Sequence, residues 1–332
     1  MLTDVLIIFI FPRLKSLTCY CIGIKKISGG LFMRTKQLLN ERIDFHTHSL
    51  ESDGENSVKE IVDLALNREH LRVIAITDHN HFSLANKYIV GSNGYFLEVL
   101  SGCEFSTTFT FPSGKKEEIH VIGIFPKNVD PNAFADLFTP IAEGKQKYVE
   151  AILENLHKMG IDLSMEEVMK EKRPTGYIGR FHIAGLMVRL GYGSTVDEIM
   201  DKYIGNFSDH YLPATDYIQY APFQTVIERI LDQSGFPILA HPYSYHKLNM
   251  DEVINIIESF HEISDGTGGL EVYYQHYTKE QQESLRKIAE KYDLVPSVAS
   301  DRHRVEQPFA NYGGYSFYKE MLVRLENRQR ED

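Results

Sequence analysis

The chain has 332 residues, 43% of them hydrophobic, which is enough to bury the core of one large domain or of two ordinary ones. Its formal net charge of −11 argues against a general binder of duplex nucleic acid and against a membrane-surface protein. The three cysteines are too few for a disulfide framework, and Cys19-Tyr20-Cys21 has poor spacing for a structural zinc site. The cytoplasm is therefore the expected compartment.

Residues 1–40 form an N-terminal extension in this interpretation. The apolar run from Val5 to Phe11 is far shorter than the roughly 20 residues needed to span a bilayer. It also lacks the basic region and the cleavage site of a secretory signal. We expect either a poorly ordered extension or a natural start at Met33. In both cases residues 1–32 would supply no metal ligand and no essential core contact.

Beyond Arg42 short apolar segments alternate with amphipathic ones, which is the pattern of an α/β domain. We predict that residues 41–125 and 223–332 form the two parts of one such domain. The predicted strands are 42–46, 71–76, 96–101, 118–125, 237–240, 269–273 and 295–299. The predicted helices of this domain follow a helix N-cap at Ser57 and then cover 82–90, 223–233, 250–261 and 279–292.

The character of the sequence changes between residues 126 and 222. No convincing strand pattern occurs from Asn132 to Ile204, whereas helical patterns cover 134–159, 164–170, 178–190 and 195–203. We interpret residues 126–222 as a small helical domain inserted into the α/β domain.

The first candidate site is His46-Thr47-His48, which ends the first predicted strand. Side chains two residues apart on a strand point to the same side, so both imidazoles can reach one ion. Neutral imidazole is a good ligand for zinc, iron or manganese. Taken alone this pair is a weak signal, because most such histidines are surface residues or satisfied core residues.

More histidines and carboxylates recur at or near the ends of the other predicted strands. The carboxyl ends of strands are where barrels and open α/β sheets build their sites. The candidate set is too large for one ion but suits two or three, and clustered ions favour the hydrolysis of phosphate esters. The candidate metal ligands are His46, His48, Asp53, His79, Glu104, His120, His241, Asp301 and His303.

These residues lie in motifs that, in this order, resemble those of the PHP (polymerase and histidinol phosphatase) superfamily. The motifs are Asp44-Phe45-His46-Thr47-His48-Ser49, Ser52-Asp53-Gly54, Ala75-Ile76-Thr77-Asp78-His79, Ser101-Gly102-Cys103-Glu104, Ile119-His120-Val121, Ala240-His241-Pro242 and Ser300-Asp301-Arg302-His303. A helical insertion before Ala240-His241-Pro242 is typical of the branch similar to 3′,5′-nucleoside bisphosphate phosphatases and their exoribonuclease relatives.

The resemblance implies a distorted (β/α)7 barrel, that is, an α/β fold with a small inserted helical domain. It implies a trinuclear site, most often of manganese and sometimes of iron or zinc, held by the nine residues above, whereas the ligand count alone suits two or three ions. It also implies that Arg180 and His182 reach from the insertion to the substrate phosphate. Arginine suits this role because its planar fork bonds two phosphate oxygens.

The sequence departs from the family pattern in three places. Asn80-His81 follows His79, where an acidic residue is usual. Arg302 stands between two candidate ligands and Arg304 comes next, which makes both candidates for phosphate contact. The segment 205–210 lacks the basic, glycine-containing turn of the branch. These departures bear on the substrate more than on the metal site.

We therefore expect a metal-dependent phosphoesterase that acts on a nucleotide or short oligonucleotide of the 3′,5′-bisphosphonucleoside type. Hydroxide generated by the metal ions would attack phosphorus, and His241 is a candidate for protonating the leaving oxygen. Two alternatives stay open. One is a phosphatase for a small metabolite such as histidinol phosphate, and the other is a catalytically silent metal- or nucleotide-binding module.

Overall fold

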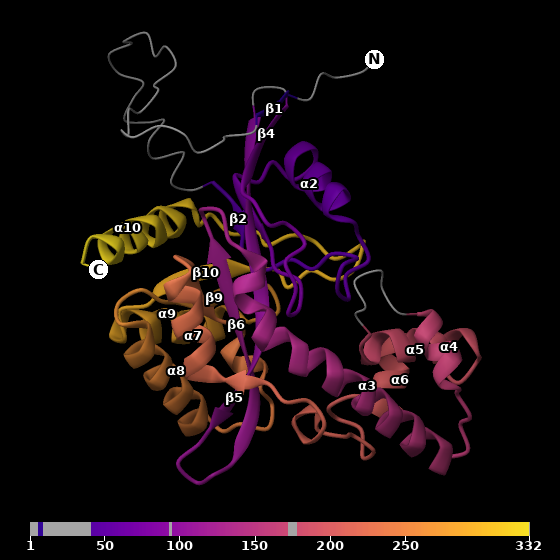
Figure 1. Cartoon of the computed structure of the whole chain (residues 1–332). Coiled ribbons are helices and arrows are strands. Elements are labelled where there is room, and N and C mark those ends of the chain that lie inside the picture. Colours follow the sequence, from indigo (N-terminus) through magenta and orange to yellow (C-terminus); the bar gives the residue numbers. More distant parts are fainter. Residues whose placement is uncertain (1–5, 9–40, 93–94, 172–177, 332) are drawn as a thin grey trace, which may run out of the picture.

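The computed structural model describes residues 6–8, 41–92, 95–171 and 178–331 of the chain (Figure 1). Strand β1 (Leu6–Ile8) pairs antiparallel with β4 (Tyr88–Ser92). The expectations for residues 9–40, including a start at Met33, lie outside the described residues. Among the described residues, no helix is both long enough and apolar enough to cross a bilayer.

Seven of the described strands form a ring whose members are β2 (Ile43–Asp44), β3 (Val73–Ile76), β5 (Tyr95–Thr110), β6 (Lys116–Phe125), β8 (Phe236–Leu239), β9 (Gly269–Tyr274) and β10 (Val295–Ala299). Each pairs with the next in this order. The ring closes where the Phe45 amide donates to the Val298 carbonyl at 2.9 Å. The expected distorted α/β barrel is confirmed.

Strand β6 runs against the direction of the other six. It pairs antiparallel with β5 on one side and β8 on the other, whereas the remaining pairs of the ring are parallel. Its residue Ile124 lies opposite Phe236, the first residue of β8. Strand β6 therefore ends at the rim where its neighbours begin.

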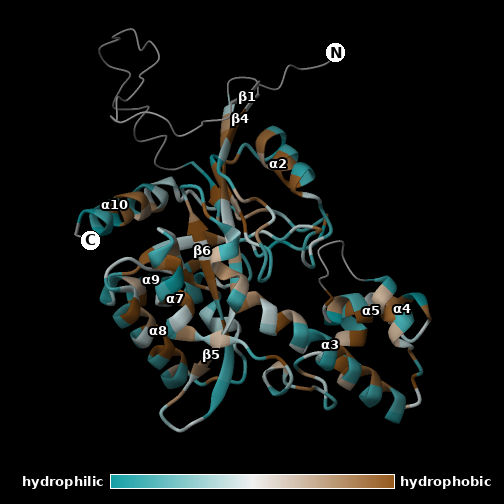
Figure 2. Ribbon diagram, viewed as in Figure 1, coloured by the Kyte–Doolittle hydropathy of each residue, from teal (hydrophilic) through white to brown (hydrophobic). Residues whose placement is uncertain are grey.

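Helices cover the outside of the ring because each has one apolar face. Helix α2 (Val58–Asn67) starts at a capping box in which Ser57 and Glu60 exchange hydrogen bonds, and it buries Ile61 and Leu66. Figure 1 shows α7 (Phe223–Asp232), α8 (Met250–Ser264) and α9 (Lys279–Lys291) grouped beside the sheet. The apolar residues of these helices alternate with polar ones, as Figure 2 shows.

The helical insertion has a hydrophobic core of its own. Its elements are η1 (Pro131–Phe134), α3 (Ala135–Lys158), α4 (Met165–Lys170), α5 (Arg180–Arg189), α6 (Val196–Ile199), the π-turn η2 (Met200–Ile204) and η3 (Ala214–Asp216). Residues such as Ile152, Leu156 and Ile183 pack in this core. The first turn of α3 belongs to the barrel instead, because Leu137 packs in one cluster with Phe125. Helix α3 thus joins the two cores (Figure 1).

Besides the short strands β1 and β7 (Ala221–Pro222), three elements differ from expectation. No helix covers 82–90, because Tyr88–Ser92 forms β4 and pairs with the start of β5; aromatic and β-branched side chains favour a strand here. Strand β5 continues to Thr110, so Glu104 lies inside a strand and not at its end. The C-terminal helix α10 (Tyr315–Glu331) was not predicted.

Candidate metal centre

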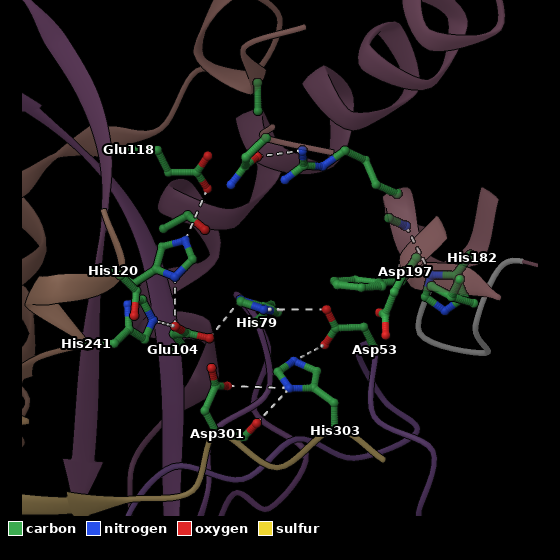
Figure 3. A pocket seen from close by; sticks show the side chains of 18 of the residues that line it. Asp53, His79, Glu104, Glu118, His120, His182, Asp197, His241, Asp301 and His303 are labelled. Carbon is green, nitrogen blue, oxygen red and sulfur yellow. Dashed lines mark hydrogen bonds and ion pairs between the residues drawn. The ribbon is translucent and has the colours of Figure 1, made fainter. Parts of the chain in front are cut away.

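The structure brings all nine candidate ligands together. His46 and His48 follow β2, His79 follows β3, and Glu104 and His120 project from the middle of β5 and β6. The others follow β8 and β10 or lie in the loop at residue 53. They form four overlapping groups in which the ligand atoms of each group lie within 4.8 Å of one another. Figure 3 labels all of them except His46 and His48. The members are His46, His48, Asp53, His79, Glu104, His120, His241, Asp301 and His303.

Glu104 is the centre of this cluster. Its Oε2 lies 3.3 Å from His46 Nε2, 3.2 Å from His48 Nε2 and 3.0 Å from His79 Nδ1. Its Oε1 lies 2.8 Å from His120 Nδ1 and 3.1 Å from a ring nitrogen of His241. Oε2 is buried without an acceptable hydrogen bond despite these three neighbours. A carboxylate oxygen in this position fits a metal ligand better than a hydrogen-bond acceptor.

Two further carboxylates complete the cluster. Asp53 lies 3.3 Å from His303 Nε2 and 3.6 Å from His79 Nε2. Asp301 Oδ1 lies 3.2 Å from His48 Nε2 and 3.4 Å from His46 Nε2. Nitrogen and oxygen donors in this ratio suit divalent manganese, iron or zinc.

The charges of the cluster depend on one another. Burial opposes ionisation of Glu104, but the histidines around it, first of all His79, hold the pKa of this carboxyl well below its usual range. Burial would also lower the pKa of His48, but its bonds to Asp301 and Glu104 raise that pKa to about 10. A protonated His48 therefore supplies the positive charge between Asp301 and Glu104 that a divalent ion would supply when bound.

The backbone is strained at two of these ligands. His241 has φ 27° and Asp301 has φ 51°, in the left-handed region that residues with a side chain seldom adopt. Such conformations cost about 1–2 kcal/mol each. They persist where the surrounding structure holds them, and they concentrate at functional sites.

Glu271 supports the cluster and was not predicted. Its Oε1 lies 2.8 Å from His46 Nδ1, and its Oε2 accepts from the His241 amide at 2.7 Å. A buried carboxylate on the far nitrogen of a histidine fixes the ring's tautomer and orientation, so that Nε2 faces the cluster. The available signal was an acidic residue inside the otherwise apolar strand Gly269–Tyr274.

A cavity of about 1470 Å³ opens beside the cluster and extends to the insertion. Arg180 and His182 line it. Arg180 donates to Asn206 Oδ1 at 2.7 Å, and its Cζ lies 5.3 Å from the centre of the Tyr211 ring. His182 Nδ1 accepts from the Gly179 amide at 3.2 Å, which fixes this ring at the start of α5. Figure 3 shows His182 beyond Asp53, apart from the cluster.

Lys145 also lines the cavity and was missed. It projects from the middle of α3, where burial lowers its pKa to about 8 although Asp53 and Glu118 act to raise it. No sequence pattern marks Lys145 as a cavity residue, because a lysine among the charged residues of an amphipathic helix usually faces solvent.

The two arginines beside the ligands behave differently. Arg304 lines the cavity, but it forms an ion pair of 2.7 Å with Asp197 of the insertion. Arg302 is only 1% exposed and is not among the residues that line the cavity. It donates to the carbonyl groups of Val305 and Gln307. The expectation that Arg302 contacts substrate is therefore corrected, since its guanidinium holds a buried loop.

The chain is similar in sequence to known phosphoesterases. The chain is 28% identical over 265 residues to a 5′-3′ exoribonuclease from Haemophilus influenzae, which covers 80% of this chain and 91% of the relative. It is 23% identical over 261 residues to a 3′,5′-nucleoside bisphosphate phosphatase from Chromobacterium violaceum, covering 79% and 87%.

A solved structure has the same fold. It is an amidohydrolase from Chromobacterium violaceum, with a TM-score of 0.69 and 21% identity over 85% of this chain and 96% of that one. The model of the PHP domain matches residues 44–325. The chain therefore belongs to the PHP domain family, and it is a metal-dependent phosphoesterase of that family.

Proposed function

We propose that the chain hydrolyses a phosphate ester of a nucleotide or short oligonucleotide of the 3′,5′-bisphosphonucleoside type. The observation that carries this proposal is that Arg180 and Lys145 line the same cavity as the nine-residue cluster. The cavity thus offers two places for anionic groups, one at the cluster and one at the cations of the insertion. A substrate with two phosphates uses both.

We propose manganese as the resident metal, in a site of two or three ions held by the nine residues. Bound divalent ions supply Lewis-acid activation of water and neutralise charge on the phosphate oxygens. The protein's contribution is to fix the donors: Glu104 faces five imidazoles, and Glu271 orients His46.

Arg180 binds the phosphate that is not cleaved. Among the described residues it forms no ion pair with a carboxylate, so its charge remains available to an anion. It is the first residue of α5, where backbone N–H groups also favour negative charge. His182 accepts from the Gly179 amide at this helix start and lines the cavity, so we propose that it reaches the substrate phosphate together with Arg180.

His241 remains the candidate that protonates the leaving oxygen. Its ring lines the cavity, and its Nδ1 is buried without a hydrogen-bond partner. The relatives support the substrate class, because one is named as an exoribonuclease and another as a nucleoside bisphosphate phosphatase.

The test compares substrates with manganese-loaded enzyme. We expect turnover of a 3′,5′-bisphosphonucleoside and of a 5′-phosphorylated oligonucleotide to exceed that of histidinol phosphate. In Arg180→Ala, the kcat/KM for the bisphosphate relative to that for p-nitrophenyl phosphate should fall about 10- to 100-fold, as expected for a lost charge-assisted contact. Arg286→Ala is the control, since Arg286 pairs with Glu283 on α9 and lies outside the cavity. Preference for histidinol phosphate would reject the nucleotide assignment.

A further inference from the structure

The mouth of the cavity carries an exposed aromatic pair. Phe207 is 69% exposed, the highest value among the described large hydrophobic side chains. Its ring lies 5.0 Å from that of His246, at an angle of 47°. Phe207 belongs to the insertion and His246 to the loop after β8, so the pair bridges the two parts of the molecule. Both residues line the cavity that holds the metal cluster.

Two cations lie against a third ring of the same mouth. Lys247 Nζ is 3.9 Å from the centre of the Tyr211 ring, and the Arg180 guanidinium carbon is 5.3 Å from it. Among the described residues Lys247 forms no ion pair. Lys247 follows His246 in the chain, which places a positive charge beside the exposed aromatic pair. The mouth therefore combines flat apolar faces with positive charge.

The cavity is larger than a single nucleotide requires. Its volume of about 1470 Å³ exceeds the roughly 300–1,000 Å³ of pockets that enclose a drug-sized ligand. The metal cluster and Arg180 account for the phosphates of one nucleotide. The mouth with Phe207 and Lys247 remains available to a further part of the substrate.

We propose that Phe207, Tyr211, His246 and Lys247 form a subsite for a second nucleotide, so that the enzyme takes single-stranded oligonucleotides. The base of the second nucleotide stacks on the exposed ring of Phe207, and Lys247 binds the next phosphate along the strand, which follows that nucleotide. Stacking on aromatic rings combined with cations along the backbone is how proteins bind single strands without sequence preference. This inference rests on the proposed function and specifies its substrate.

The kinetic test is a ratio of two substrates. We compare kcat/KM for 5′-phosphorylated tetra-adenylate with that for adenosine 3′,5′-bisphosphate. Wild type should favour the oligonucleotide, and Phe207→Ala should lower the ratio about tenfold, the loss expected for one stacked base. Lys247→Gln should lower the ratio too. The controls are Phe96→Ala, an exposed ring outside the cavity, and Lys202→Gln, a cation on Tyr203 outside it.

A spectroscopic test uses the absence of tryptophan from the chain. Phe207→Trp keeps a stacking ring, so it should restore the ratio. Its emission should be quenched when the manganese-loaded enzyme binds a phosphorothioate-linked tetra-adenylate. Phe96→Trp, the matched control, should not respond.

The outcomes separate the two proposals. If nucleotide esters are turned over but the ratio is the same in wild type and Phe207→Ala, the subsite is rejected and the proposed function stands. If no nucleotide ester is turned over but the Phe207→Trp emission is quenched, the proposed function is rejected and the subsite stands. Equal quenching in Phe207→Trp and Phe96→Trp also rejects the subsite.

Discussion

Glu271 shows how one carboxylate fixes two ligands from behind. It contacts the His46 ring through Oε1 and the His241 amide through Oε2, and it is fully buried. In Glu271→Gln the amide group cannot accept at both positions, so one N–H must face the NH2 group. Because such orienting partners typically contribute 10- to 100-fold to metal affinity, we expect a loss of about this size with the fold retained.

Titration with Mn²⁺ followed by calorimetry measures this loss. Glu258→Gln is the matched control, since Glu258 accepts a hydrogen bond from Tyr292 far from the cluster. Unchanged affinity in Glu271→Gln would mean that packing alone orients His46.

At the residue scale, the sequence predicts the site residues that lie in short local motifs. The nine candidate ligands lie in short motifs, and the barrel brings them together. Glu271 and Lys145 act through contacts between distant segments, so no local pattern marks them. Arg302 shows the opposite error: polarity suggested exposure, whereas carbonyl groups and the face of Phe309 surround its buried guanidinium.

Helix α10 packs one face against the barrel, and its two faces allow a controlled comparison. Met321 is 1% exposed in a cluster with Ile43 and Val298, whereas Val323 on the same helix is 54% exposed. Met321→Ala should lower the free energy of unfolding by about 2–5 kcal/mol, because it removes buried contacts and leaves a cavity. Val323→Ala should change it by less than about 0.5 kcal/mol.

Urea unfolding followed by circular dichroism measures both variants. Equal effects would show that α10 does not pack as described.

At the element scale, periodicity predicted the segments whose burial is regular. The strand Val295–Ala299 and the helix Met165–Lys170 have the clearest signals, an apolar run and a capping box. The hairpin of β4 and β5 was missed because its pairing, and not its local pattern, makes Tyr88–Ser92 a strand. The length of β5 likewise depends on its partner β6.

For the whole molecule, metal and protons compete for one set of ligands. In this structure the contacts with Glu104 and its neighbours raise the pKa values of His48 and His120 to about 10, above the ordinary value near 6.5. Their pairing thus stabilises the metal-free fold fully below about pH 6.5, and this contribution is lost as pH rises through about 10. The lowered pKa values of Asp53 and Glu104 matter only in acid.

We therefore expect the thermal midpoint of EDTA-treated protein to fall between about pH 6.5 and 8.5, while the gain on adding Mn²⁺ grows over the same range. Scanning calorimetry with EDTA or Mn²⁺ at both pH values checks this. His48→Gln should lose most of the gain, whereas His157→Gln, an exposed histidine of α3, should keep it. A gain that shrinks with rising pH would contradict the competition.

Because β6 runs in the reversed direction, the length of α3 determines where the insertion and Lys145 lie relative to the metal cluster. The chain leaves β6 at the rim opposite the metal cluster, and α3, with 24 residues and thus about 36 Å of length, carries it back past the cavity. One added residue before Lys145 would turn this side chain by about 100° around the helix and advance it by about 1.5 Å. Insertion or deletion of about four residues before Lys145 nearly preserves the direction in which its side chain points, because four residues are close to one whole helical turn. The distance between the metal cluster and the cavity-lining residues of the insertion therefore depends on the number of helical turns in α3.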